Sequence, residues 1–342
     1  HQGYEYVDLG RFWQAFLFVG LLIWLVLMFR PLLPALKKAD ENKPLLILFA
    51  ISIIAIALFY GAGLMWGQRT HLAMAEYWRW WVVHLWVEGV WELIMGGILA
   101  FLLIKLTGVD REVIEKWLYV IVGLTFLSGI LGTGHHYYYI GVNKIWLVVG
   151  GIFSALEPLA FLAMALFAIY MYRKGEKSHP NKIALFWTVG SAIVSFVGAG
   201  LLGFAHTLPQ TNLYTHGTLV TAMHGHYAFW GAYAMIVLAI ISYALPNMTG
   251  RKRYDNANGH LAFWLSNVGM LGMVTALGVA GVVQVYLERR LKMDFMIAQE
   301  EVKIHFVVML TCATVFTIGI LYYMYEFIKY GLPTDEALEE NN

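Results

Sequence analysis

The segment HLWVEGVWE places His84, Glu88 and Glu92 at intervals of four residues. Side chains four residues apart lie on one face of an α-helix, so this segment would present one imidazole and two carboxyl groups together. The surrounding residues are apolar, and carboxylates on a membrane-buried helix need a compensating cation, a proton or a water-filled cavity. From this helix alone, a metal site and the polar seam of a transporter are both open interpretations.

A histidine pair supplies further candidate ligands. His135 and His136 are adjacent and are followed by three tyrosines, Tyr137 to Tyr139. An isolated pair of this kind is more typical of hydrogen-bonded interfacial residues than of ligands. Together with His84, however, it provides three imidazoles, to which Glu88 could add an oxygen. Such a set suits a divalent first-row metal, and the hard oxygen favours iron or zinc over copper.

A second histidine motif, MHGHYAF, separates His224 and His226 by two residues. On a helix these side chains point about 200° apart, so they cannot readily share one metal ion. They could instead each ligate a different haem on opposite sides of the helix, and Gly217 and Gly225 would let flat macrocycles approach. The same motif would also be found if both histidines were buried and hydrogen-bonded to backbone carbonyls, without any haem.

The composition indicates that these residues lie in a membrane. Of the 342 residues, 60% are hydrophobic, 15% aromatic and 13% charged, and the mean hydropathy is +0.64, outside the range of soluble domains. A bilayer-spanning helix needs ~20 apolar residues, and such runs occur about nine times. Backbone groups in lipid must bond internally, which predicts helices. We therefore expect an all-α, polytopic transmembrane bundle and one integral membrane domain over residues 1–342.

The expected helices cover residues 12–33, 45–66, 80–104, 117–131, 145–172, 183–204, 216–245, 261–287 and 304–330. Eight of the 23 Lys and Arg residues lie on one side of this arrangement: Arg11, Arg69, Arg79, Lys144, Arg289, Arg290, Lys292 and Lys303. The remaining 15 lie on the other side, which is predicted to be cytoplasmic. The histidine pair then faces outward, toward the periplasm of a bacterium. The net charge of +1 argues against a nucleic-acid partner, and the single cysteine, Cys312, excludes a thiolate metal cluster.

Several longer motifs resemble the catalytic large subunit of bacterial nitric oxide reductases, which belong to the haem-copper oxidase superfamily. They are WWVVHLWVEGVWELIMGGILAF, VDREVIEKWLYV, GTGHHYYYIG, FSALEPLAF, GFAHTL and THGTLVTAMHGHYAFWGAYAMI. The resemblance runs over residues 77–245 and continues less distinctively to the C-terminus. The opening HQGYEYVDLGRFWQ is similar only loosely.

The resemblance implies a ligand set. His84, His135, His136 and Glu88 would hold a non-haem iron. His224 would be the proximal ligand of a high-spin haem b, and the neighbouring His226 one axial ligand of a low-spin haem b. Related oxidases have copper at this place and a tyrosine four residues after the first histidine. Glu88 stands there instead, which favours nitric oxide over dioxygen as substrate.

The resemblance also assigns catalytic roles to buried carboxyl groups. Glu92 and Glu157 would lie near the iron and steer protons, although Glu157 could also serve only to bond the backbone next to Pro158. That proline is expected to kink its helix. Glu5 resembles a glutamate at a calcium site, and a plain surface role is equally open. His206 and His216 could bond haem propionates or cap helices, whereas His1, His71, His179, His260 and His305 are expected at the surface or the membrane interface.

The family's large subunit has twelve helices, so the resemblance implies three further N-terminal helices and the second ligand of the low-spin haem. We expect an upstream segment or a separate chain to supply them, since the sequence opens on His1 rather than Met. The continuation VWELIMGG looks closer to the cytochrome-c-dependent type, which pairs with a small membrane-anchored cytochrome c subunit. A quinol-dependent enzyme is the alternative.

The predicted function is therefore reduction of two NO molecules to nitrous oxide and water at a haem b/non-haem iron centre in the bacterial inner membrane. An oxygen reductase is disfavoured by Glu88, and a nitric oxide dismutase by the intact ligand set. A b-type electron-transfer cytochrome would need His224 and His226 but not the other histidines. A proton-coupled transporter would need the carboxyl groups but no histidine cluster.

Overall fold

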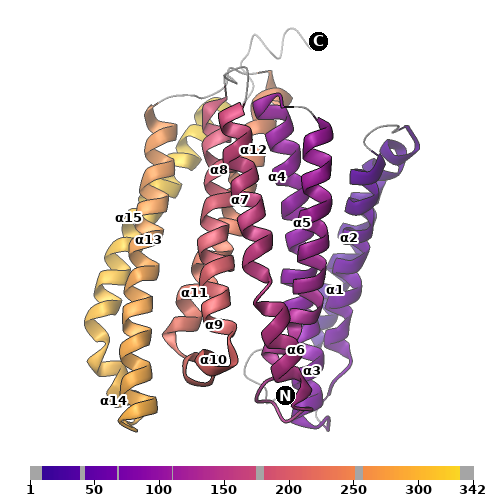
Figure 1. Ribbon diagram of the computed structural model, residues 1–342. Helices are drawn as coiled ribbons and strands as arrows, with labels where there is room; N and C mark the ends of the chain where they lie inside the picture. The colour runs from indigo at the N-terminus through magenta and orange to yellow at the C-terminus, as the bar shows by residue number, and fades with distance from the viewer. Residues whose placement is uncertain are drawn as a thin grey trace. The chain divides into compact units, whose positions relative to one another are not determined.

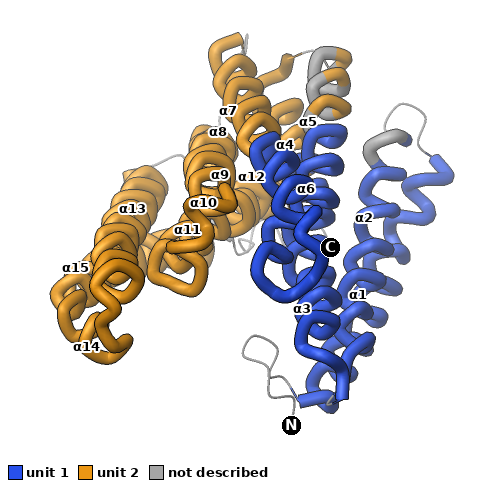
Figure 2. The backbone as a smooth tube through the Cα atoms, turned by 60° about the horizontal axis from the view of Figure 1, so that its bottom comes forward, with its two compact units in different colours: residues 1–97, 122–157 blue, residues 98–121, 158–342 orange. Residues whose placement is uncertain are grey.

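The computed structural model describes residues 10–38, 43–67, 69–109, 111–174, 181–250 and 257–331. Within these ranges the chain is helical and contains no strand, which confirms the all-α prediction. The helices divide into two compact units, drawn in different colours in Figure 2. Unit 1 comprises residues 1–97 and 122–157, and unit 2 comprises residues 98–121 and 158–342. The two units are described separately below.

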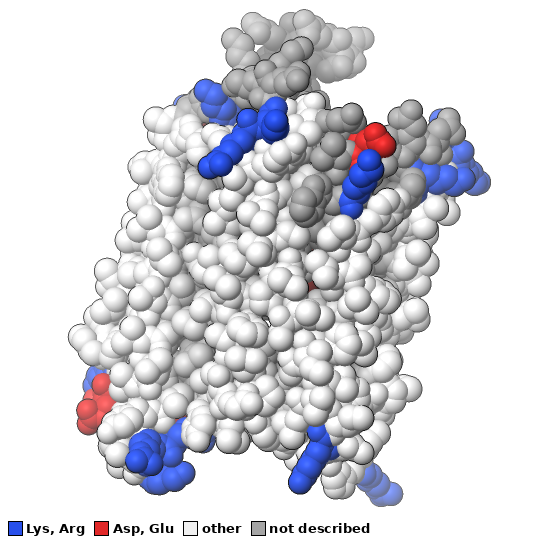
Figure 3. Space-filling model, viewed as in Figure 1, with Lys and Arg blue, Asp and Glu red and all other residues white. Residues whose placement is uncertain are grey.

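Eight helical stretches in the described residues are long and apolar enough to cross a bilayer. They are Arg11–Lys38, Leu46–Leu64, Leu72–Thr107, Ile145–Lys174, Lys182–Thr207, Leu219–Thr249, Ala257–Arg290 and Lys303–Lys329. The ninth expected span, 117–131, lies within helix α5 (Arg111–Gly132). On the visible face, Lys and Arg side chains gather at the helix ends and leave the helix lengths nearly uncharged (Figure 3). The chain is therefore a multi-pass membrane protein, and the number of candidate spans in the described residues is close to the number predicted.

Unit 1 begins with two long helices, α1 (Arg11–Lys38) and α2 (Lys43–Gly61), which pack side by side (Figure 1). A short turn, η1 (Ala62–Leu64), ends the second of them. The next span is composite: α3 (Leu72–Trp80), the π-helical stretch η2 (Trp81–Trp91) and α4 (Glu92–Thr107) follow one another without a break. Helix α2 packs against η2, where the rings of Tyr60 and Trp86 lie 5.7 Å apart. Aromatic packing thus helps to hold η2 against α2.

The rest of unit 1 brings the histidine pair against a second helix. Helix α5 leads into the turn η3 (Thr133–His136), and α6 (Ile145–Ser154) packs on that turn. The two backbones cross at glycines, because a Cβ on Gly150 would lie 2.4 Å from the carbonyl carbon of Gly134. Larger residues would hold the two elements apart.

Helix α6 ends at Ser154 and α7 (Glu157–Lys174) begins three residues later. Proline has no N–H to continue the hydrogen-bond ladder, so it is tolerated in the first turn of a helix and not in its interior. The interruption at Ala155 and Leu156 places Pro158 in the first turn of α7, which confirms the predicted kink. It leaves Ser154 and Glu157 at two adjoining helix ends.

Unit 2 is built from further long helices, several with π-helical stretches within them. One runs through α8 (Lys182–Ser195), η4 (Phe196–Leu201) and α9 (Leu202–Thr207), and the short α10 (Pro209–Thr215) follows. The next runs through α11 (Leu219–Phe229), η5 (Trp230–Ala234) and α12 (Met235–Thr249). The last elements are α13 (Ala257–Val285), η6 (Tyr286–Arg290), α14 (Phe295–Glu301) and α15 (Lys303–Gly331).

Small residues set the close packing in unit 2. Helices α13 and α15 lie side by side along much of their length (Figure 1). A Cβ on Gly269 of α13 would lie 2.4 Å from the backbone nitrogen of Phe316, and one on Gly281 would lie 2.4 Å from that of Val220 on α11. Such contacts are typical of helices that associate within a membrane. They fix α11, which carries His224 and His226, against α13.

Candidate metal centre

The structure brings His84, Glu88, His135 and His136 together within unit 1. One ligand atom from each of these residues lies within 4.8 Å of all the others. Nδ1 of His84 is 3.1 Å from Nε2 of His136 and 3.1 Å from Oε2 of Glu88. Nε2 of His135 is 2.9 Å from Nε2 of His136. Ligands from two separate segments thus converge, since His84 and His136 are 52 positions apart in the sequence.

The helix that carries His84 and Glu88 differs from the ordinary α-helix assumed from sequence. Residues Trp81–Trp91 form a π-helix, in which each turn takes slightly more than four residues. Residues four apart therefore lie almost directly above one another, and the imidazole of His84 meets the carboxylate of Glu88. Stretches of this kind occur frequently at functional sites.

Close backbone packing supplies an outer partner for His84. A Cβ on Gly129 of α5 would lie 2.8 Å from the carbonyl oxygen of Glu88, so only glycine allows α5 to approach η2 this closely. The carbonyl oxygen of Gly129 then accepts a hydrogen bond from Nε2 of His84 over 2.7 Å. This bond directs Nδ1, the other ring nitrogen, toward the cluster.

The histidine pair is also held from outside the cluster. Nδ1 of His135 is 2.7 Å from the hydroxyl oxygen of Ser154, and that hydroxyl lies 3.4 Å from the carbonyl oxygen of Gly132. The ring of His136 stacks on Trp80, with centroids 3.6 Å apart and planes inclined by 8°. Neither contact was predicted from sequence. The spacing of four residues between Trp80 and His84 could have indicated that both side chains lie on one face of the helix. No sequence pattern could have indicated the contact of Ser154, because Ser154 lies 19 residues from His135.

The protonation pattern of the rings favours a bound cation. A carbonyl can only accept, so Nε2 of His84 carries the proton and Nδ1 keeps its lone pair in the neutral ring. The hydroxyl of Ser154 donates toward Gly132 and accepts from Nδ1 of His135, which leaves a lone pair on Nε2 of that ring. The lone pair on Nδ1 of His84 lies 3.1 Å from Oε2 of Glu88, and both lone pairs lie about 3 Å from Nε2 of His136. A cation at the centre would relieve this repulsion.

The spacing of the nitrogens also suits a metal ion. Two ligands at right angles, each with a bond of ~2.1 Å, are about 3.0 Å apart. The observed nitrogen separations are 2.9 Å and 3.1 Å. Three imidazoles and a carboxylate are ligands that iron and zinc accept. The residues present therefore fit a divalent first-row metal.

Two further carboxyl groups lie next to the cluster. Glu92 and Glu157 are buried, with relative exposures of 5% and 8%. Both carboxyl groups lie close enough to Glu88 to interact with it electrostatically. Glu88 thus interacts with the imidazole of His84 and with two buried carboxyl groups. Glu5, the predicted calcium ligand, lies outside the described residues.

In unit 2, His224 and His226 each hydrogen bond to a backbone carbonyl through Nδ1. Nδ1 of His224 is 2.9 Å from the oxygen of Gly198 in η4, and Nδ1 of His226 is 2.7 Å from the oxygen of Ala222. A ring that donates from Nδ1 carries its lone pair on Nε2, which is the arrangement of many metal-bound histidines. A Cβ on Gly203 would lie 3.2 Å from Cε1 of His224, so glycine permits this approach.

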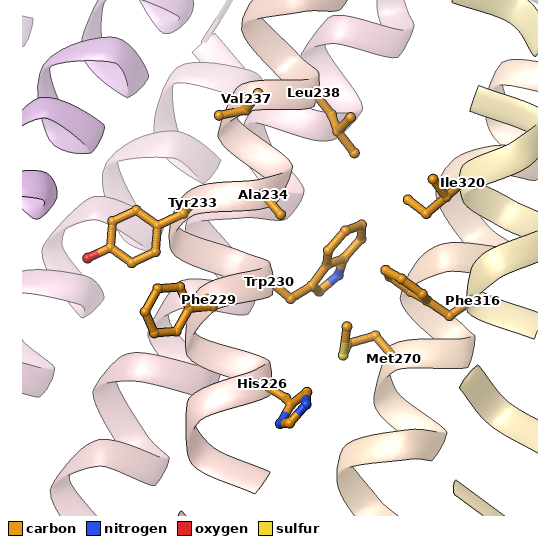
Figure 4. A pocket seen from close by; sticks show the side chains of 10 residues that line it. All are labelled: His226, Phe229, Trp230, Tyr233, Ala234, Val237, Leu238, Met270, Phe316 and Ile320. Atoms are coloured by element: carbon orange, nitrogen blue, oxygen red, sulfur yellow. The ribbon is translucent and has the colours of Figure 1, made fainter. Parts of the chain in front are cut away.

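An apolar pocket of about 680 Å³ adjoins His226. Its lining consists of His226, Phe229, Trp230, Tyr233, Ala234, Val237, Leu238, Met270, Phe316 and Ile320. Figure 4 shows the imidazole pointing from α11 into the space beside α13, near Met270. Aromatic and aliphatic walls with one imidazole suit a flat, apolar ligand that needs an axial nitrogen.

Two other histidines noted from the sequence, His206 and His71, have local partners. His206 is buried, and its Nδ1 and Nε2 lie 2.8 Å and 3.1 Å from the hydroxyls of Thr215 and Thr221. Both ring nitrogens therefore have protein partners. His71 caps the first turn of α3, where its side chain accepts a hydrogen bond from the backbone N–H of Ala73.

The chain is similar to known proteins along most of its length. A family model described as "Cytochrome C and Quinol oxidase polypeptide I" matches residues 1–316. A nitric oxide reductase subunit of Stutzerimonas stutzeri is 42% identical over 335 residues, which cover 88% of this chain and 71% of the relative. The residues that the family model matches include both histidine motifs. The resemblance noted from the motifs is thereby confirmed.

Proposed function

The chain belongs to the cytochrome c and quinol oxidase polypeptide I family, and we propose that it is the catalytic part of a nitric oxide reductase. The observation that carries this proposal is the carboxylate of Glu88 among three converging imidazoles. An oxygen ligand at this place favours iron over copper. The relationship to a subunit of a nitric oxide reductase supports the same conclusion, and the chain is accordingly an oxidoreductase.

The proposed cofactors are a non-haem iron and two b-type haems. His84, Glu88, His135 and His136 would hold the iron, His224 a high-spin haem b, and His226 a low-spin haem b. When bound, these groups supply the electrons and the Lewis acidity that join two NO molecules into nitrous oxide. The second axial ligand of the low-spin haem is expected from outside this sequence.

The chain's own residues would place the ligands and handle protons. Formation of nitrous oxide and water from two NO molecules consumes two electrons and two protons. Glu92 and Glu157 are buried and lie close enough to Glu88 to interact with it electrostatically. We propose that these carboxyl groups deliver the protons.

We further propose a location and a set of partners. The distribution of Lys and Arg between the two sides favours the bacterial inner membrane, with the metal cluster toward the periplasm. Both units would form one integral membrane domain surrounded by lipid. A small membrane-anchored cytochrome c subunit is the proposed electron donor, with quinol as the alternative, and a calcium ion at Glu5 remains a prediction from sequence.

Metal analysis of the purified complex, combined with one variant, tests the proposal. Two b haems and one non-haem iron per complex are expected. Haem without non-haem iron would indicate a b-type cytochrome, and neither would indicate a transporter. Glu88→Ala should lose non-haem iron and NO reduction while it retains both haems. The ligand assignment is wrong if this variant keeps full iron content and turnover.

A further inference from the structure

The hydroxyl group of Ser154 has different hydrogen-bond partners from those of most buried serines in the described helices. Ser52, Ser128, Ser195, Ser242 and Ser266 all donate to the carbonyl four residues earlier in their own helix. That is the usual behaviour of a helical serine. The hydroxyl of Ser154 instead reaches across to Nδ1 of His135 at 2.7 Å and to the carbonyl oxygen of Gly132 at 3.4 Å.

The backbone around Ser154 is built to hold this contact. Gly150 and Gly134 cross in direct contact, which sets the distance between α6 and the turn that carries His135. Ser154 follows Gly150 by one helical turn and so lies on the same face of α6. The helix ends at this residue, and Ser154 is only 1% exposed. Water therefore does not compete for the hydrogen bond.

The direction of the hydrogen bond between Ser154 and His135 decides which nitrogen of His135 can bind a metal. Because the hydroxyl donates to Gly132, it accepts from Nδ1–H of His135. This acceptance keeps the proton off Nε2, the nitrogen that faces His136 at 2.9 Å. A ring held at Nδ1 also cannot rotate away from the other ligands.

We propose that Ser154 is a positioning residue for the metal centre, which fixes the tautomer and the orientation of His135. The proposal rests on the metal site of the proposed function. Removal of a hydrogen-bond partner of a metal-ligating histidine typically changes the affinity for the metal by about 10–100-fold. Ser154→Ala should therefore weaken metal binding although every ligand is present.

The purified complex, with iron loaded or removed, provides the test. Ser154→Ala, Ser154→Thr and wild type are titrated with an iron chelator, and the non-haem iron that remains is measured beside the haem content. Ser154→Ala should release iron at about 10–100-fold lower chelator concentration. Ser154→Thr retains the hydroxyl and should release iron at a concentration between those of Ser154→Ala and wild type. Ser128→Ala is the matched control, since it removes a buried hydroxyl that bonds only within α5.

A second measurement separates positioning from simple packing. The gain in thermal unfolding midpoint on iron loading reports metal affinity, because a ligand stabilises the form that it binds. This gain should shrink in Ser154→Ala and stay at the wild-type value in Ser128→Ala. A merely structural serine would lower the midpoints of the loaded and depleted forms equally, and that result overturns the proposal.

One further variant distinguishes the two proposals. If wild type holds iron, His135→Ala loses it and Ser154→Ala keeps it with wild-type affinity, then only the role of Ser154 is wrong. If the wild-type complex holds no non-haem iron, the metal site itself is wrong and the role of Ser154 falls with it.

Discussion

The indole of Trp80 stacks on the imidazole of His136 with centroids 3.6 Å apart and planes inclined by only 8°. These two rings are therefore almost parallel, whereas the rings of His84 and His135 are inclined by 80°. Trp80 is the last residue of α3, directly before the π-helical stretch that carries His84 and Glu88. Trp80 therefore connects the helix that carries His84 to the imidazole ring of His136.

Trp80→Leu should loosen the orientation of His136. Stacked rings of this kind contribute about 0.5–1.5 kcal/mol, which corresponds to a loss of iron affinity of up to about tenfold. Trp80→Phe keeps a ring in place and should lose less. Chelator titration of non-haem iron in both variants checks the prediction. Equal iron affinity in Trp80→Leu and wild type would contradict it.

Glu157→Gln should reduce turnover while iron stays bound. The amide keeps the size and polarity of the carboxyl group but cannot release a proton, and loss of a general acid or base typically lowers rates by about 10²–10⁴-fold. NO consumption and metal content, measured on the same preparation, test this expectation. Iron loss in parallel with activity would instead show that Glu157 supports the ligands. Glu157→Asp, which retains the proton, is the matched control.

Gly150→Ala should damage the centre without touching a ligand. The new Cβ would lie 2.4 Å from the backbone of Gly134, so α6 and η3 must separate. Overpacking of this kind costs about 1–3 kcal/mol or more, and His135 would move with the turn. Gly123→Ala in α5 is the control, since its Cβ meets nothing within 4 Å. The thermal unfolding midpoint and the iron content should fall in Gly150→Ala and stay at the wild-type values in Gly123→Ala.

Removal of the metal should separate stability from catalysis. Chelation is expected to lower the unfolding midpoint, because bound metal stabilises the folded form by mass action. Zinc accepts the same nitrogen and oxygen ligands but has no redox chemistry. Added zinc should therefore restore the midpoint and leave NO reduction absent. Restored turnover with zinc would rule out a redox role for this site.

His224→Ala and His226→Ala should each remove a different haem. The two imidazoles bond to different carbonyls on α11 and η4, and only His226 lines the apolar pocket in Figure 4. Optical and EPR spectra of reduced and oxidised complexes should show loss of the high-spin signal in the first variant and of the low-spin signal in the second. Loss of the same signal in both would contradict separate ligation.

Much of this protein can be predicted from sequence because membranes restrict the choice of structure. Apolar runs of bilayer length can only be helices, so the all-α fold and eight of the expected spans agree with the structure. The break before Pro158 also follows from local chemistry, since proline lacks an N–H. The histidine and glutamate motifs could be recognised because each lies within a short, distinctive segment.

The sequence by itself determined which side chains were available: His84 and Glu88 four residues apart, and His135 beside His136. Only the tertiary structure decided that these two segments meet, through the π-helix of Trp81–Trp91 and the glycine contacts at Gly129 and Gly134. It also decided that Ser154 and Trp80 hold the rings. The physical reason is that spacing along a helix is set by covalent geometry, whereas contact between helices depends on how closely their backbones can approach.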